Sequence, residues 1–319
     1  MNMEAIAFNT PGDPDVLEVH ELPDPEPGPG EVLIRVQAAA VSPTDTMRRA
    51  GLRDSKNPGP YVVGMDAAGV VEAIAEDTDT YLKLGDKVMA IVLPNGSHGA
   101  YADRIVVPAD SVVRIPENAS LIEASTLPMN GLTARLALDT LDLPKGATLA
   151  VTGAAGTLGG YIIQLAKNDG LTVIADAAEN DEELVKSRGA DVVLPRGEDY
   201  ANKILEQFPD GVDGIVDGAV QVDEIVPAAK DGATIITIRG ANGERERGVT
   251  LKDIWVVNYD QEHDKLDTLR QQVEDGILTL KVEDVLPKEQ APEAHRRMEA
   301  GGVRGRLVLE FGVIPETSF

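Results

Sequence analysis

Hydrophobic and polar positions alternate differently in the first third of the chain and in its middle. Short apolar runs at 31–41, 69–74, 87–92 and 104–107 are separated by turn signals such as Gly85-Asp86 and Asn95-Gly96. Apolar runs of this length, bounded by turn residues, are typical of β-strands. The first third is therefore predicted to be a β-rich, partly barrelled domain, whose shorter runs at 5–22 are also of β type.

From about Leu121 helical patterns alternate with short apolar runs, which read ATLAVTG, LTVIADA, ADVVLP, GIVDGAV and ATIITIRG. Such runs are typical of parallel strands buried on both faces, and their alternation with helices predicts a doubly wound α/β sheet. After about Asp260 the pattern predicts a helix, a loop, a second helix and a final strand, RLVLEF.

The glycine-rich stretch VTGAAGTLGG, at 151–160, lies where an apolar strand meets a helix. Its spacing, Ala154-x-Gly156-x-x-Gly159, has alanine at the first position of the dinucleotide fingerprint. In such a motif the glycines let a pyrophosphate approach the backbone and the helix N-terminus. Asp176 ends the next apolar run, near where an acidic side chain accepts hydrogen bonds from the adenosine ribose. We therefore predict a dinucleotide site in preference to a glycine turn that only packs helix on strand.

The short-chain dehydrogenases share a similar glycine pattern, but their chemistry needs a tyrosine with a lysine four residues later. None of the six tyrosines has one, since Leu165 follows Tyr161 at that spacing and Ile204 follows Tyr200. This alternative is set aside.

The amino-acid composition excludes several classes of function. The chain has 319 residues, no cysteine, four histidines and a formal net charge of −25. Without cysteine there is no thiolate nucleophile and no sulfur-ligated zinc site, and a strongly acidic chain is repelled by nucleic acid and anionic membranes. No apolar run is long enough to span a membrane and no secretory signal precedes the first strand, so we expect a cytoplasmic protein.

Seven segments taken in order resemble the medium-chain dehydrogenase/reductase superfamily, and most closely its zinc-free quinone oxidoreductase branch. They read VSPTDTMRRAG, GPYVVGMDAAGVV, LGDKV, HGAYAD, TLPMNGLTA, VTGAAGTLGG and AHRRMEAGGVRGRLVLEF. The resemblance implies a GroES-like catalytic domain built from residues 1–122 and 261–319, with a Rossmann domain at 123–260 between them. It also implies a homodimer that reduces a small-molecule electron acceptor.

Zinc-dependent members of the superfamily place a metal-binding cysteine and histidine where this chain has Ser42 and Met65. The resemblance therefore implies hydride transfer without zinc, to a quinone or an α,β-unsaturated carbonyl. Relatives often have tyrosines where Met47 and Arg53 stand, so this pocket has less aromatic surface for a flat quinone.

The same resemblance supplies candidate catalytic residues. Ser42 either orients the acceptor or the nicotinamide or bonds its own loop backbone. Asp45 either fixes that loop through hydrogen bonds or donates protons. Thr133 lies near the nicotinamide or packs within a helix. Arg196 and Arg239 follow strand ends, and Arg304 lies in a segment returning to the cleft, where it or Arg306 pairs with a cofactor phosphate or forms a surface salt bridge. The predicted cofactor-binding residues are Gly153, Ala154, Ala155, Gly156, Thr157, Leu158, Gly159, Asp176, Arg196, Arg239 and Arg304.

Two choices stay open at this point. Asp176 favours NADH, because a carboxylate repels the 2′-phosphate of NADPH, whereas the resemblance favours NADPH. The function itself has two alternatives: an enoyl-thioester reductase, or a nucleotide-binding structural or redox-sensing protein with little turnover.

Overall fold

The computed structural model describes residues 2–53 and 57–312, and the chain divides into two compact units. Unit 1 contains residues 1–129, 260–275 and 280–319, and unit 2 contains residues 130–259 and 276–279. We predicted the domain boundaries after residues 122 and 260. The division in the structure follows Met129 and Tyr259, and it adds a short segment at 276–279 to unit 2.

Unit 1 is β-rich and takes its strands from both ends of the chain. Its strands are β1 (Asn2–Phe8), β2 (Glu18–Pro23), β3 (Glu31–Ala40), β4 (Tyr61–Val62), β5 (Asp66–Ile74), β6 (Lys87–Ile91), β7 (Arg104–Pro108), β8 (Val112–Arg114), β16 (Val282–Pro287) and β17 (Arg306–Glu310). Its helices are α1 (Pro43–Arg49), α2 (Leu121–Ala124), α7 (His263–Glu274) and α8 (Ala291–Ala300), with short 3₁₀ turns η1 (Pro14–Val16), η2 (Ala109–Ser111) and η7 (Lys288–Gln290).

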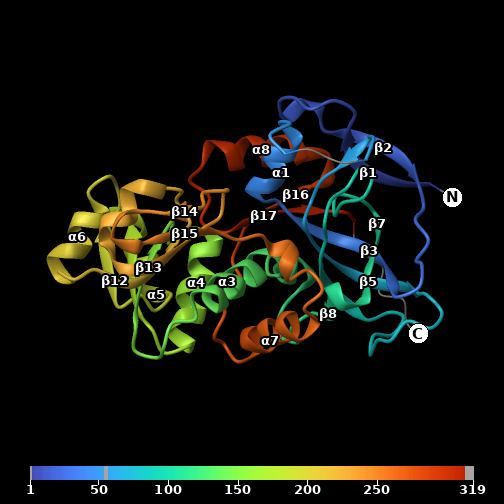
Figure 1. Cartoon of the computed structure of the whole chain (residues 1–319). Helices are drawn as coiled ribbons and strands as arrows, with labels where there is room; N and C mark the ends of the chain where they lie inside the picture. Colours follow the sequence, from blue (N-terminus) through green and yellow to red (C-terminus); the bar gives the residue numbers. More distant parts are fainter. Residues whose placement is uncertain (1, 54–56, 313–319) are drawn as a thin grey trace. The chain divides into compact units, whose positions relative to one another are not determined.

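The strand β3 organises the larger sheet of unit 1, whose order is β16-β17-β3-β5-β6-β8, with β7 also paired to β3. Every second residue of β3 is buried until its last three, which are all buried, as expected for a strand with one face on a core. Antiparallel pairing places Val308 of β17 opposite Ala40, so the blue and red segments of Figure 1 lie side by side in one sheet. Strands β2, β1 and β4 form a separate three-stranded sheet.

Two elements of unit 1 differ from the sequence prediction. Strand β16 was predicted as part of a loop, because three consecutive residues, Glu283, Asp284 and Val285, are exposed and give no alternating pattern. Helix α1 was not predicted either. It begins after Ser42 with Pro43 at its first position, and its seven residues are too few to show a helical period.

Unit 2 contains a seven-stranded sheet in the order β11-β10-β9-β12-β13-β15-β14. All neighbours are parallel except β14 and β15, so the first six strands have the 3-2-1-4-5-6 order of a dinucleotide-binding fold. The strands are β9 (Thr148–Thr152), β10 (Thr172–Ala177), β11 (Val192–Pro195), β12 (Val212–Asp217), β13 (Ala229–Thr237), β14 (Gly243–Glu244) and β15 (Thr250–Asp253). The five apolar runs singled out in the sequence correspond to β9, β10, β11, β12 and β13, which confirms the predicted doubly wound sheet.

Four helices accompany this sheet. They are α3 (Pro128–Leu141), which starts at the junction of the units, α4 (Thr157–Asn168), α5 (Glu182–Ser187) and α6 (Tyr200–Gln207), with 3₁₀ segments η3 (Glu179–Asp181), η4 (Val222–Ala228), η5 (Glu246–Gly248) and η6 (Val256–Asn258). Helix α4 buries Tyr161, Ile162, Leu165 and Ala166, the face predicted from the sequence. Within the part of the chain that the structure describes, no helix is long and apolar enough to cross a membrane.

Candidate functional site

The glycine loop between β9 and α4 has a geometry that only glycine permits at two positions. Gly153 has φ +69°, and a Cβ on it would lie 3.0 Å from the Gly218 carbonyl carbon. A Cβ on Gly159 would lie 2.4 Å from the Gly153 carbonyl oxygen. Gly156 is the residue before α4, in an extended conformation that a side chain tolerates. The backbone between β9 and α4 is therefore held in one tight turn.

The first turn of α4 follows this loop directly, so Thr157 and Leu158 belong to the helix N-terminus. The first N–H groups of a helix have no partner within it, and together with the helix dipole they attract a phosphate. The loop and the helix end thus fit the pyrophosphate of a dinucleotide, with Ala154 and Ala155 in the turn itself.

Asp176 lies at the carboxyl end of β10, almost fully buried. Its Oδ1 accepts a hydrogen bond of 2.8 Å from the Ala154 N–H. Burial raises the pKa of Asp176, while the loop amides of Ala154 and Gly153 and the charge of Arg196 oppose that rise. The carboxylate predicted to bind the ribose therefore also holds the glycine loop.

Two arginines lie near this loop, in different roles. Arg188, directly after α5, donates to the carbonyl oxygens of Ala154 (2.7 Å) and Gly156 (2.9 Å). A Cβ on Gly160 would lie 2.7 Å from the Arg188 Cζ, so the guanidinium packs directly on α4. Arg196 is exposed after β11, and its charge reaches Asp176.

Sequence reasoning did not select Arg188 as a functional residue. It was noted only as a cation near Asp176 in sequence, and nothing in its local pattern marks it as a partner of the loop carbonyls. The glycine doublet Gly159-Gly160 was a usable signal, because a second glycine in the first turn of a buried helix leaves space for a side chain from another element.

In unit 1 the predicted residues Ser42 and Asp45 form a buried capping box at the start of α1. The Ser42 Oγ and backbone N–H both donate to Asp45 Oδ2, at 2.9 and 2.8 Å, and the Gly64 N–H donates to Oδ1 at 3.0 Å. Burial raises the pKa of Asp45 to about 6 against the opposing effect of these bonds. Asp45 accepts the hydrogen bonds that hold the loop, and the Ser42 hydroxyl bonds within the box. Proton donation by Asp45 and a role of Ser42 toward an acceptor stay predictions.

A second buried carboxylate, Asp66, lies in the same unit and is paired with Arg306 at 2.7 Å. Arg306 also donates to the carbonyl oxygens of Val41 and Thr126. Burial raises the pKa of Asp66, whereas the Arg306 charge lowers it. All three bonds of Arg306 tie β17 to the interior of unit 1, where this side chain is buried.

The remaining predicted residues are distributed over both units. Thr133 is buried in the second turn of α3 in unit 2, and Arg239 is exposed two residues after β13. Arg304 is half-buried in unit 1, before β17. Their roles toward a cofactor stay predictions.

Over residues 2–53 and 57–312, no group of three or more His, Asp or Glu side chains is arranged to hold a metal ion. Met65, at the position of a metal ligand in zinc-dependent relatives, is buried next to Asp66 in the chain.

Comparisons with known proteins agree with this architecture. Residues 28–117 match the family described as alcohol dehydrogenase GroES-like domain, and residues 188–309 match zinc-binding dehydrogenase. The chain is 34% identical over 241 residues to a trans-enoyl reductase of Aspergillus terreus, a match that covers 68% of this chain and 78% of that one. A solved NAD-dependent alcohol dehydrogenase superposes with a TM-score of 0.86 at 30% identity, covering 97% of this chain and all of that one. The chain belongs to the medium-chain dehydrogenase/reductase superfamily.

Two further relatives carry names close to the predicted chemistry. An NADPH-dependent alkenal/one oxidoreductase of Arabidopsis thaliana is 32% identical over 248 residues, or 75% of this chain, which spans 63% of that relative's length. A quinone oxidoreductase of Sus scrofa is 28% identical over 325 residues, 96% of this chain and 97% of that one. The glycine loop and the strand order give unit 2 the architecture of a dinucleotide-binding fold.

Proposed function

We propose that this protein is an NAD(P)H-dependent oxidoreductase that reduces a quinone or an α,β-unsaturated carbonyl without zinc. The observation that carries the proposal is the dinucleotide cradle of unit 2, in which Gly153 and Gly159 shape the turn and Asp176 holds it from β10. The names of the plant and mammalian relatives support the acceptor class. Independence from zinc is supported by the absence of cysteine and by Met65 at a ligand position.

A reduced nicotinamide cofactor supplies a hydride when it is bound. The residues of this chain would bind and orient it: the amides at the start of α4 would face the pyrophosphate, and Asp176 would accept from the ribose. Arg188 fixes the loop carbonyls, and Asp176 also accepts from the loop. In unit 1 the Ser42–Asp45 box keeps the start of α1 rigid through buried hydrogen bonds. Rigid support of this kind keeps a bound acceptor oriented.

We propose that Asp176 makes NADH the preferred cofactor, because its carboxylate disfavours a 2′-phosphate at the end of β10. Arg196 acts in the opposite direction, because an exposed guanidinium near Asp176 offers a charged partner for a 2′-phosphate. Separate fluorescence titrations with NADH and NADPH measure the preference, and Asp176→Ser should shift the ratio of the two Kd values toward NADPH. An unchanged ratio would exclude Asp176 as the determinant.

The activity is tested by adding 1,4-benzoquinone or but-3-en-2-one to the protein and reduced cofactor and following absorbance of the reduced nicotinamide. Oxidation that requires both protein and acceptor is the expected result. A metal chelator should leave the rate unchanged, and loss of activity with chelator, restored by zinc, would contradict the zinc-free mechanism. Tight cofactor binding without oxidation by any acceptor would favour the low-turnover binding protein.

Reduction of an enoyl thioester is the second candidate, and the likeness to a trans-enoyl reductase favours it. Crotonyl-coenzyme A in the same assay distinguishes the two, because a thioester reductase should prefer it to but-3-en-2-one by kcat/KM.

We also propose a cytoplasmic homodimer. The edge of the unit 2 sheet supports pairing, because the short strand β14 bonds only to β15 within that sheet, and Trp255 and Val257, soon after β15, are 43% and 50% exposed. Sedimentation velocity should give a dimer for the wild type and a larger monomer fraction for Val257→Ser. A wild-type monomer at all concentrations would exclude this assembly.

A further inference from the structure

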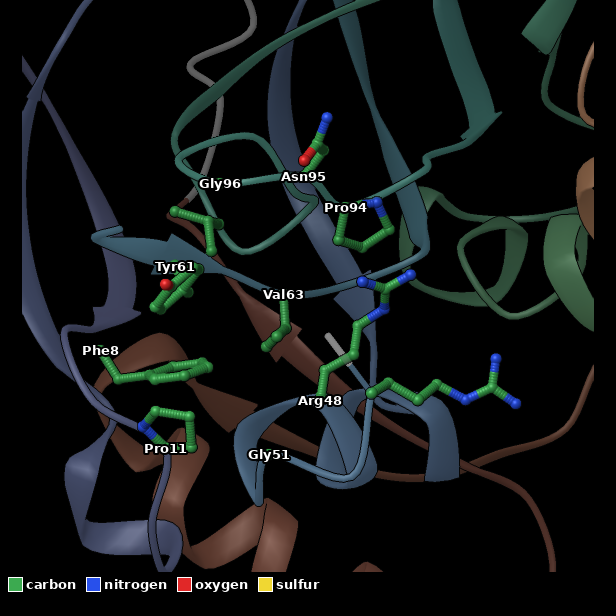
Figure 2. A pocket seen from close by; sticks show the side chains of 11 residues that line it. Phe8, Pro11, Arg48, Gly51, Tyr61, Val63, Pro94, Asn95 and Gly96 are labelled. Atoms are coloured by element: carbon green, nitrogen blue, oxygen red, sulfur yellow. The ribbon is translucent and has the colours of Figure 1, made fainter. Parts of the chain in front are cut away.

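A pocket of about 150 Å³ lies within unit 1, between the end of α1, strand β4 and the loop after β6 (Figure 2). Its lining combines aromatic and aliphatic side chains with two guanidinium groups, those of Arg48 and Arg53. The described lining residues are Phe8, Pro11, Arg48, Gly51, Arg53, Tyr61, Val62, Val63, Pro94, Asn95 and Gly96, and none of them is acidic. Among these described lining residues there are thus two arginines and neither Asp nor Glu, in a chain with 54 acidic and 29 basic residues.

Arg48 has the lining donor that is most clearly available to an anion. It lies in the last turn of α1, and in Figure 2 its side chain extends toward the loop that carries Pro94. Its Nε is buried and has no hydrogen-bond partner among the described residues. Burial lowers the pKa of Arg48, and the charge of Asp45 opposes that effect. A buried cationic donor without a partner is costly, so such a site favours an anion that completes its bonds.

Asp45 does not supply that partner. Both of its carboxylate oxygens already accept hydrogen bonds from Ser42 and Gly64. Asp45 therefore attracts Arg48 through the helix without occupying its donors, and these remain directed at the pocket.

The rest of the lining suits a small apolar body. Phe8 and Tyr61 pair across β1 and β4 with ring centroids 5.4 Å apart, and Pro11 and Val63 add aliphatic surface. A cavity of this volume accepts a ligand of about six carbon atoms, the size of benzene. The pocket thus has room for a short carbon skeleton with one anionic group.

We propose that this pocket binds the carboxylate of the acceptor, and that the acceptor is a short unsaturated keto acid. The proposal rests on the proposed reductase function. Helix α1 connects the proposed acceptor-orienting residues to the pocket, because Ser42 and Asp45 stand at its start and Arg48 at its end. In the reaction the C=C bond gains a hydride at its β-carbon and a proton from water at its α-carbon, the reduced dinucleotide is oxidised, and the carboxylate stays unchanged.

The test compares 4-oxopent-2-enoate with its methyl ester, which has the same enone but no charge. The ester is intrinsically the more electron-poor alkene, so a preference for the acid must come from the protein. We expect the wild type to prefer the acid by kcat/KM, and Arg48→Met to lower the acid-to-ester ratio about tenfold or more, as for loss of a hydrogen bond to a charged group. Arg114→Met, an exposed arginine elsewhere in unit 1, should leave the ratio unchanged.

A wild type without preference for the acid, or an Arg48→Met protein with the wild-type ratio, would overturn the proposal. Calorimetric titration with the saturated acid 4-oxopentanoate tests the pocket independently of turnover. If neither enone is reduced but this acid binds the wild type and not Arg48→Met, the reductase function fails and the carboxylate site stands. If it binds both proteins equally or neither, the site is excluded.

Discussion

The glycines of the loop 153–159 have separable tasks. Gly159 is fixed by packing, because a Cβ there would meet the Gly153 carbonyl oxygen at 2.4 Å and the Ala154 Cα at 2.7 Å. Gly156 has an ordinary extended conformation, φ −73° and ψ 172°, and its Cβ would lie 3.3 Å from the nearest atom. Its absent side chain instead leaves the space that the proposed pyrophosphate site needs.

We therefore expect Gly159→Ala to lower the free energy of unfolding by about 1–3 kcal/mol, as in overpacked cores. Gly156→Ala should keep a nearly wild-type melting temperature and still lose most NADH affinity. Thermal melts and fluorescence titrations of both variants measure the two effects. Equal destabilisation by the two substitutions would contradict this division of tasks.

Asp45 gives a pH dependence whose sign follows from its environment. Burial raises its pKa from 3.8 to about 6, so the folded protein keeps this proton to a higher pH than the unfolded chain. Its contribution to stability is complete below about pH 4 and is lost as the pH rises through about 6. At about 1.4 kcal/mol per pH unit the loss is about 3 kcal/mol.

Asp45→Asn should remove this loss of stability with rising pH. The difference in the free energy of unfolding between wild type and variant should therefore change by about 3 kcal/mol between pH 4 and 7. Denaturant unfolding across the pH range measures it, with the exposed Asp110→Asn as a control. Parallel curves for wild type and Asp45→Asn would show that Asp45 titrates normally.

For single residues, a functional role is predictable from the sequence where the residue belongs to a motif that few other structures use. The loop glycines and Asp176 are in this class, because a strand followed by Ala-x-Gly-x-x-Gly and a helix has few other uses. Arg188 and Arg48 are not, because an arginine near a helix end is normally solvated and only the tertiary structure shows what its donors face.

Among the elements, α5 supports α4 through one side chain. Arg188 at the end of α5 holds two loop carbonyls and packs on Gly160 in α4. Arg188→Leu should raise the Kd for NADH about tenfold, or about 1.4 kcal/mol. Gly160→Ala should act in the same direction, because its Cβ displaces the guanidinium.

Lys186→Met is the matched control, since Lys186 lies in the same helix but pairs with Glu182 on the surface. Fluorescence titration measures all three variants. A Kd in Arg188→Leu equal to that of Lys186→Met would show that the loop keeps its geometry without the arginine.

Strands were predictable from the sequence where nearly all of their residues are buried. The parallel strands β9, β10 and β12 are almost wholly buried and read as continuous apolar runs. Strand β16 pairs with β17 by backbone hydrogen bonds while exposing three acidic or apolar side chains in succession, so its sequence resembles a loop. Helix α1 is too short for a period, although its Ser-Pro-x-Asp start carries a capping signal.

For the whole molecule, charge is the dominant surface property. A formal net charge of −25 makes the folded chain repel itself, and this repulsion falls as the Debye length shrinks. We expect the melting temperature to rise by several degrees from low ionic strength to about 1 M KCl, where the Debye length is about 3 Å. Calorimetry in KCl, with sucrose at equal osmolality as a control, measures it. A melting temperature that falls with KCl would show that the surface ion pairs outweigh the net repulsion.

The pairing of β17 with β3 has a consequence during synthesis. Val308 and Ala40 are partners in one sheet, so the sheet of unit 1 stays incomplete until residues 306–310 leave the ribosome. At about 5–20 residues per second, β3 waits on the order of tens of seconds for that strand. The strands of unit 2 all lie between Thr148 and Asp253, and they are translated within this interval. The nascent chain therefore completes its dinucleotide-binding unit first, while the end of β3 at Ala38–Ala40 has only β5 as a partner until translation reaches β17.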